Sequence, residues 1–112
     1  MKLTTHSFKD GQQIPGDFAF GIVDPEYHVG LGSNRNPQLA WSDAPAGTRS
    51  FALICHDPDV PSQGDDVNQE DRTVPASLPR VDFFHWVLFD LPASLSEIGE
   101  GEFSNDVTPR GK

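Results

Sequence analysis

The chain contains two apolar runs that carry polar side chains, CHDPDVP at residues 55–61 and FFHWVLFDLP at residues 83–92. Asp57 and Asp59 follow the first run, and His85 stands near the start of the second. If the two runs are neighbouring strands, these three side chains meet at one end of a sheet. A few polar groups on an apolar scaffold are the usual form of a ligand pocket. The sequence therefore predicts a small polar site at this place.

Length and composition limit the classes of protein to which the chain can belong. Its 112 residues suffice for one domain with a modest core. Ten glycines and ten prolines are too many for a helical bundle. The net charge of −9 disfavours nucleic acid, which is bound mainly through Lys and Arg, and it disfavours anionic membrane surfaces. We expect no nucleic-acid partner and no stable membrane insertion.

Cys55 is the one cysteine of the chain, so no internal disulfide can form. This usage is typical of an intracellular protein. The first residues lack an apolar stretch of signal-peptide length, and no run is long enough to span a membrane. The sequence therefore predicts a cytoplasmic protein. Because Cys55 lies within an apolar run, it is expected to be a buried and unreactive core residue.

Short apolar segments separated by Gly, Pro and Asp indicate an all-β fold. The expected strands lie at residues 3–8, 18–23, 38–41, 50–56 and 83–91. The last of these is almost continuously apolar, which predicts a strand that is buried on both faces. The segment SLSE at residues 94–97 fits a capping box, but the glycines that follow allow at most one helical turn.

Residues 62–82 form a long acidic connection between the two strongest strands, and we expect a surface loop there. It carries Asp65, Asp66, Glu70 and Asp71 before its first basic residue, Arg72. Loops of this length are usually functional or mobile. Two interpretations stay open, a solvated surface excursion and a flap over the polar site.

The carboxylates and the imidazole of the predicted site suggest anion binding. Asp57 and Asp59 would share one strand face, and their mutual repulsion calls for a cation or a shared proton. His85 can supply that cation, and an imidazolium suits a phosphate or sulfate oxygen. In the alternative interpretation, both carboxylates bond backbone amides in a turn and His85 is an ordinary half-buried histidine.

Two other kinds of chemistry are weaker. His56, Asp57, Asp59 and His85 could supply metal ligands, but their spacing matches no metal motif, and His56 should point to the opposite strand face from Asp57. We therefore predict no metal and no cofactor. No serine stands in a nucleophile elbow, so we predict a protein that is not an enzyme. A hydrolase that uses Asp57 and His85 as an acid–base pair stays as an alternative.

The order of these motifs resembles the phosphatidylethanolamine-binding protein family, and in particular its bacterial Raf-kinase-inhibitor-like branch. The resemblance extends from about Leu3 to Pro92. It rests on DPDVP at residues 57–61 and HWV at 85–87, with support from NPQLAW at 36–41 and PAGTRSF at 45–51.

The resemblance implies an antiparallel β-sandwich in which a large central sheet packs on a smaller sheet, with a minor peripheral helix. It also implies a shallow pocket at one end of the central sheet that binds phosphate or phosphorylated head groups such as phosphorylethanolamine. By motif position, its ligand-binding residues are Asp57, Asp59, Pro61 and His85. Family members also inhibit kinases or proteases, so a regulatory protein with a protein partner is an alternative function. The sequence leaves a homodimer open.

Two departures from the family pattern affect these expectations. The connection at residues 62–82 is longer than in the simplest bacterial members. The family also continues with a Gly-Pro-Pro turn and a His-Arg-Tyr strand, which give the pocket a second histidine and an aromatic, and nothing here matches them. Residues 109–112 look like the approach to that region. We therefore expect one domain over residues 1–112, truncated or nicked at its C-terminal end, with one pocket wall absent.

Overall fold

The computed structural model describes residues 1–106, and over this range the fold is all-β, as predicted. The strands of the described part form three antiparallel sheets, one with three strands and two with two strands. A short 3₁₀ helix, η1 (Gly16–Phe18), is the helical element of that part. No helix among residues 1–106 is long and apolar enough to cross a membrane. The sandwich packing stays a prediction, and the expected feature at residues 109–112 lies outside the described residues.

The chain divides into two compact units, Met1–Thr48 with Ser94–Lys112, and Arg49–Ala93. The first unit contains a three-stranded sheet with β4 (Leu39–Ser42) between β1 (Lys2–Thr4) and β7 (Glu97–Ile98). In the register of this sheet, Leu3 lies opposite Trp41 on one side of β4. On the other side, Leu39 lies opposite Ile98. Trp41 and Ile98 are buried, and they form the apolar core of this unit.

The capping box at residues 94–97, for which at most one helical turn was expected, does not start a helix, because Glu97 belongs to strand β7. Gly99 and Gly101 follow so closely that a helix would be too short for its hydrogen bonds to offset the unfavourable nucleation step. Pairing with β4 instead satisfies the backbone and leaves Ile98 only 1% exposed. Tertiary burial therefore decides the conformation of this segment.

Two buried amide side chains hold the loops of the first unit. The Asn36 side chain donates to the carbonyl of Gly99 at 2.9 Å and accepts from the backbone amides of Phe103 and Ser104 at 2.9 and 3.0 Å. Gln38 donates to Glu97 Oε1 at 2.9 Å. The segment at residues 36–41, quoted above for its family resemblance, thus has a structural role in this unit.

Strands β2 (Gly21–Asp24) and β3 (His28–Leu31) form a hairpin, and β3 was not predicted from the sequence. Its turn is held by Asp24, whose Oδ1 accepts from the backbone amides of Glu26 and Tyr27 at 2.8 and 2.7 Å. His28 closes the turn with a φ of +63°, in the left-handed region. The short run HVGL gives little strand signal by itself, and the turn chemistry determines the pairing.

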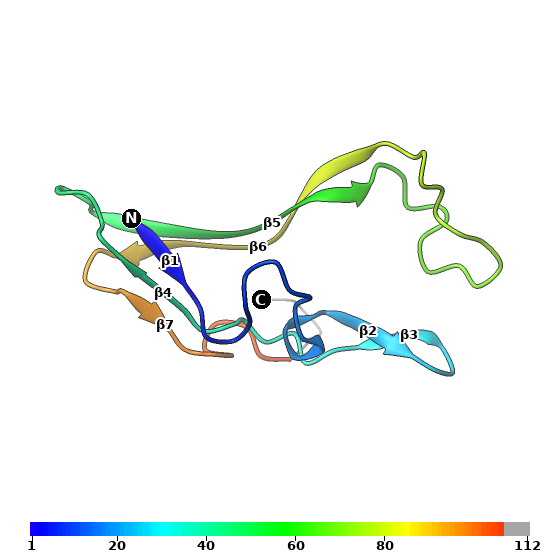
Figure 1. Ribbon diagram of the computed structural model, residues 1–112, viewed down its shortest axis with the longest axis horizontal. Coiled ribbons are helices and arrows are strands. Elements are labelled where there is room, and N and C mark those ends of the chain that lie inside the picture. Colours follow the sequence, from blue (N-terminus) through cyan, green and yellow to red (C-terminus); the bar gives the residue numbers. More distant parts are fainter. Residues whose placement is uncertain (107–112) are drawn as a thin grey trace. The chain divides into compact units, whose positions relative to one another are not determined.

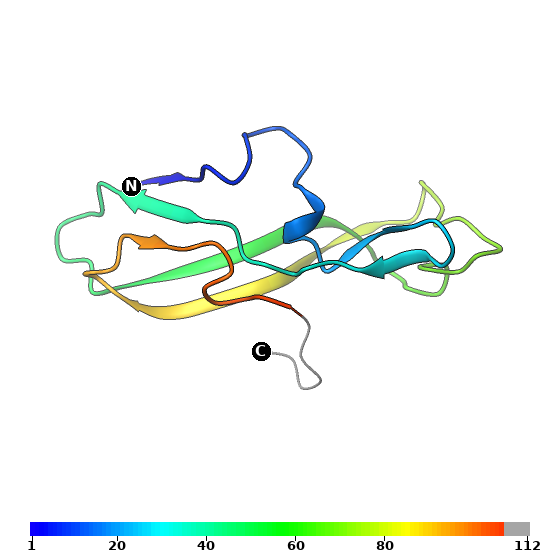
Figure 2. The same cartoon turned by 90° about the horizontal axis from the view of Figure 1, so that it is seen from below.

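The second unit is a long two-stranded ribbon of β5 (Ser50–Pro61) and β6 (Arg80–Pro92), which run side by side in both views (Figures 1 and 2). Both strands are longer than predicted, because pairing continues through the Asp-Pro-Asp-Val-Pro segment to Pro61 opposite Arg80. The connecting loop therefore covers residues 62–79. Three register shifts interrupt the ladder, and two of them flank the dipeptide His56-Asp57.

The prediction that the second apolar run is buried on both faces is wrong. Phe83, Phe84, Val87 and Phe89 are between 50% and 69% exposed. The structure records β6 in a ladder with β5 alone among the described strands, so no sheet continues on its other side. Cys55 is also exposed, which corrects its assignment to the core. Leu91 is the buried apolar residue of β6.

Candidate functional site

The candidate site lies on the β5–β6 ribbon, where an imidazole meets a carboxylate across the two strands. His85 Nε2 lies 3.3 Å from Oδ2 of Asp57, and the side chains are 50% and 40% exposed. The ladder pairs Cys55 with Trp86 and then His56 with Phe84, so His85 is the extra residue of a bulge. Bulges re-aim side chains next to functional sites. Here the bulge places the ring of His85 within reach of Asp57.

Asp57 also accepts a local backbone hydrogen bond. Its Oδ1 takes the amide hydrogen of Asp59 at 2.8 Å. This bond lowers the pKa of Asp57 below its ordinary value of 3.8, with further lowering from the hydrogen bond with His85 and from the charges of His85 and His56. The two interpretations of Asp57 are therefore compatible, because one carboxylate bonds both a backbone amide and the imidazole. Asp57 remains an anion at neutral pH.

The other predicted site residues lie nearby on the ribbon. Asp59 contributes its backbone amide to Asp57, and Pro61 ends β5 opposite Arg80. We expected Asp57 and Asp59 to share a strand face because side chains alternate between the two faces. A register shift between Asp57 and Val60 interrupts this alternation. The polar residues also lie within the ribbon and not at a sheet end, because β5 and β6 both continue past them.

His56 does not join this cluster, as the alternation of strand faces predicted. Its Nε2 lies 3.0 Å from Oδ1 of Asp82, and its ring stacks on Phe84 at 5.2 Å between centroids. The rings of His85 and Phe83 instead form a T-shaped pair with 4.9 Å between their centroids. Among residues 1–106, no three His, Cys, Asp or Glu side chains lie close enough to hold a metal ion.

The loop at residues 62–79 carries its own ion pairs. Arg72 lies 3.0 Å from Asp71 and 3.6 Å from Asp66. Figure 1 shows the loop continuing outward from the ends of β5 and β6. This arrangement favours the interpretation as a solvated excursion over that as a flap.

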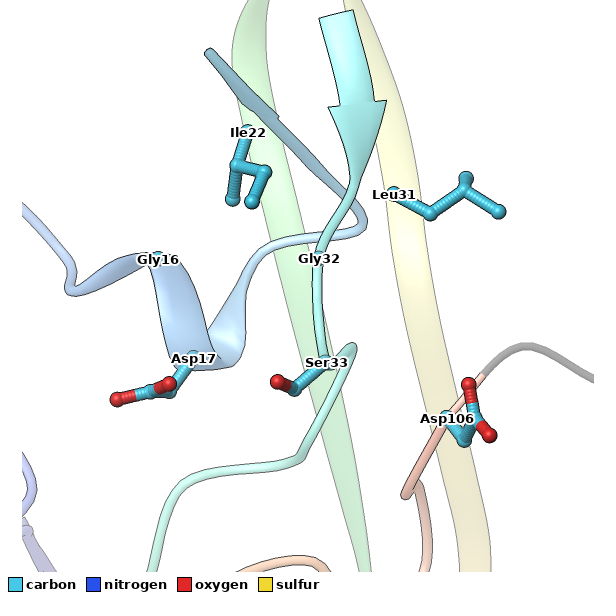
Figure 3. Close-up of a pocket in the computed structure, with 7 residues that line it drawn as sticks. All are labelled: Gly16, Asp17, Ile22, Leu31, Gly32, Ser33 and Asp106. Carbon is cyan, nitrogen blue, oxygen red and sulfur yellow. The ribbon is translucent and has the colours of Figure 1, made fainter. Parts of the chain in front are cut away.

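A depression of about 440 Å³ in the first unit was not predicted from the sequence. Its polar groups are the carboxylates of Asp17 and Asp106 and the hydroxyl of Ser33. Figure 3 shows the two carboxylates pointing in different directions. Polar groups that do not converge give no fixed orientation to a ligand. The ribbon therefore remains the candidate site.

Comparison with known proteins identifies the family. A family model described as phosphatidylethanolamine-binding protein matches residues 4–111. The chain is 32% identical over 101 residues to YbhB of Escherichia coli strain K12. The matched residues make up 90% of this chain and 50% of YbhB. The chain is 30% identical over 100 residues to a UPF0098 protein of Aquifex aeolicus strain VF5, with coverage of 89% and 42%. YbcL of Escherichia coli strain K12 is 27% identical over 95 residues, with coverage of 85% and 40%.

The chain therefore belongs to the phosphatidylethanolamine-binding protein family, as its motifs indicated. Its bacterial relatives include YbhB and YbcL. The chain spans about half the length of the curated relatives that it matches.

Proposed function

We propose that the β5–β6 ribbon carries a binding site for a small anion, namely phosphate or a phosphorylated head group. The observation that supports this proposal most directly is the 3.3 Å contact between His85 Nε2 and Asp57 Oδ2. Both residues fall in the segments that carry the family resemblance, and the family is named for binding phosphatidylethanolamine. Half of the His85 side chain is exposed, so the ring is accessible to a ligand.

Asp57 fixes how His85 presents its protons. An anionic Asp57 accepts from Nε2, which therefore carries a hydrogen. In the neutral ring Nδ1 is then an acceptor, whereas in the imidazolium it becomes a second donor. An anionic oxygen needs that donor, so binding requires protonated His85.

The charge of the surroundings favours one ligand class over another. The Asp57 carboxylate lies beside the imidazole, Asp59 follows two residues later on β5, and the chain as a whole has a net charge of −9. A bare phosphate dianion meets repulsion from this field. Phosphorylethanolamine carries an ammonium group beside its phosphate, which offsets the repulsion. We therefore expect phosphorylethanolamine to bind at least as tightly as inorganic phosphate.

The test is a titration of the 112-residue chain with inorganic phosphate and with phosphorylethanolamine, followed by the ¹H–¹⁵N signals of the His85 ring. Saturable shifts of the His85 ring signals at millimolar ligand support the proposal. The accompanying shift of the Asp59 backbone amide, which donates to Asp57, should be lost in His85→Gln. His6→Gln is the matched control, because it removes a histidine of the other unit and should leave the titration unchanged. Absence of any response of His85 contradicts the proposal.

A hydrolase is the second candidate, because a histidine–carboxylate pair is also an acid–base pair. It is tested in the same samples with p-nitrophenyl phosphate. Turnover with a bell-shaped pH profile that disappears in His85→Gln would favour the hydrolase over simple binding. Inhibition of a kinase or protease rests on family membership, and no contact described above favours it.

A further inference from the structure

A second histidine–carboxylate contact lies on the opposite face of the ribbon from the candidate site. His56 Nε2 is 3.0 Å from Asp82 Oδ1, and the His56 ring lies on Phe84 with an interplanar angle of 28°. The register pairs His56 with Phe84 and then Asp57 with Phe83. Because successive residues of a strand point to opposite faces, the two histidine–carboxylate contacts lie back to back.

The second contact lies where two register shifts interrupt the β5–β6 ladder. Register shifts occur between Cys55 and His56 and again between Asp57 and Val60. Bulges leave residues unpaired and change the local twist, so the backbone alone constrains this part of a two-stranded ribbon poorly. Contacts between side chains on the two strands then have more influence on the position of β5 relative to β6.

The contact links the strands on both sides of the Asp57–Phe83 pair. His56 precedes Asp57 on β5, and Asp82 precedes Phe83 on β6. A link from His56 to Asp82 therefore limits how far Asp57 can move or rotate relative to β6. His85 follows Phe84, on which the ring of His56 is stacked.

We propose that His56 and Asp82 are positioning residues, whose contact on the back of the ribbon holds Asp57 in place for His85. This inference rests on the proposed function, since the arrangement that they hold is the anion site. His56 also acts through its charge, which contributes to the low pKa of Asp57. If the contact between His56 and Asp82 were a surface ion pair without such a role, its removal would leave the site on the other face unchanged.

The test uses Asp82→Asn and His56→Phe in the 112-residue chain. Asp82→Asn is nearly isosteric and removes one charge, and His56→Phe keeps an aromatic ring on Phe84 but removes Nε2. Arg72→Gln is the matched control, because it breaks an exposed ion pair in the loop at residues 62–79. The readouts are the affinity for inorganic phosphate, the ¹³C titration of the Asp57 carboxyl without ligand, and the thermal midpoint.

The sign of the change at Asp57 separates positioning from simple electrostatics. Loss of the negative charge of Asp82 lowers the pKa of Asp57 if the geometry is unchanged. Loosening of the contact with His85 raises it instead. We expect Asp82→Asn to raise the pKa of Asp57 and to weaken phosphate binding by about three- to tenfold, as for coupled neighbours, with little change in the thermal midpoint. We expect a larger effect of the same sign for His56→Phe.

Wild-type phosphate affinity in both variants, or a lowered pKa of Asp57 in Asp82→Asn, would overturn the inference. If the wild-type protein does not bind phosphate, the proposed function fails, but the Asp57 titration still tests the positioning role. If His56→Phe does not fold, Asp82→Asn supplies the same measurements. Any change in Arg72→Gln that matches the change in Asp82→Asn would also count against a specific link.

Discussion

His85 Nε2 and Asp57 Oδ2 lie 3.3 Å apart although 28 positions separate the two residues in the sequence. The contact crosses from β6 to β5 and exists because a bulge places one extra residue on β6. The same Asp57 carboxylate accepts the amide hydrogen of Asp59. The candidate site is therefore a feature of strand pairing and of a local backbone bond together.

Asp57 should contribute to the pH dependence of stability. Its pKa in the folded chain is lowered, chiefly by the backbone bond from Asp59 and then by His85. A lowered folded-state pKa gives stability that is present above the ordinary value of 3.8 and is lost as the pH falls through the folded-state pKa. We expect the advantage of wild type over Asp57→Asn in urea unfolding to shrink below about pH 4. A difference that stays constant from pH 6 to pH 2 would contradict this assignment.

Cys55 should react slowly for an exposed thiol. Its pKa is raised from 9.0, first by partial desolvation of the sulfur and then by the negative charge of Asp57. The thiolate is the reactive form, so we expect alkylation by iodoacetamide at pH 8 to be slower in the folded chain than in the urea-unfolded chain. Asp57→Asn should accelerate the reaction of the folded chain. An equal rate in the folded and unfolded chains would show that the environment of Cys55 is not as described.

Asn36→Ala should strongly destabilise the first unit. Asn36 is only 4% exposed, and its replacement removes the acceptor of the half-buried backbone amides of Phe103 and Ser104. Unsatisfied buried groups cost about 1–3 kcal/mol each, so we expect a loss of about 3 kcal/mol in the free energy of unfolding. Denaturant unfolding measures it. Asn105→Ala, an exposed asparagine in the same unit, is the control and should change stability by less than about 0.5 kcal/mol.

His28→Gly should stabilise the β2–β3 hairpin. His28 has a φ of +63°, which costs an L-residue with a Cβ about 1–2 kcal/mol. Glycine relieves that strain but loses more backbone entropy on folding, so the net gain should be at most about 1 kcal/mol. His28→Ala keeps the Cβ and should not stabilise. Thermal unfolding of the two variants separates relief of strain from loss of the imidazole.

Two truncations on β6 should differ in their cost. Phe89 is 69% exposed, whereas Leu91, two residues later, is 5% exposed. We expect Leu91→Ala to cost about 2–5 kcal/mol, as for other buried leucines. Phe89→Ala should cost less than about 1 kcal/mol, because most of its surface is already in water. Similar costs for the two variants would mean that Phe89 is buried in solution.

Much of the secondary structure was predictable from residue patterns. The strands at β4, β5 and β6 were expected, because each contains a run of apolar residues bounded by turn formers. Strand β3 was missed, since His28 to Leu31 is short and includes a glycine. The segment that ends at Glu97 matches a capping box, which allowed at most one helical turn. Pairing with β4 outweighed that signal, as tertiary contacts often outweigh local propensity.

The sequence by itself determined the all-β class, the family and the segments that carry Asp57 and His85, because these depend on local residue order. The opposite orientation of His56 and Asp57 also followed from the two-residue period of a strand. Only the tertiary structure decided that Asp57 contacts His85, that His56 pairs with Asp82, and that β6 exposes its phenylalanines. Register shifts and burial depend on which strands meet, and residues far apart in the sequence establish those pairings together.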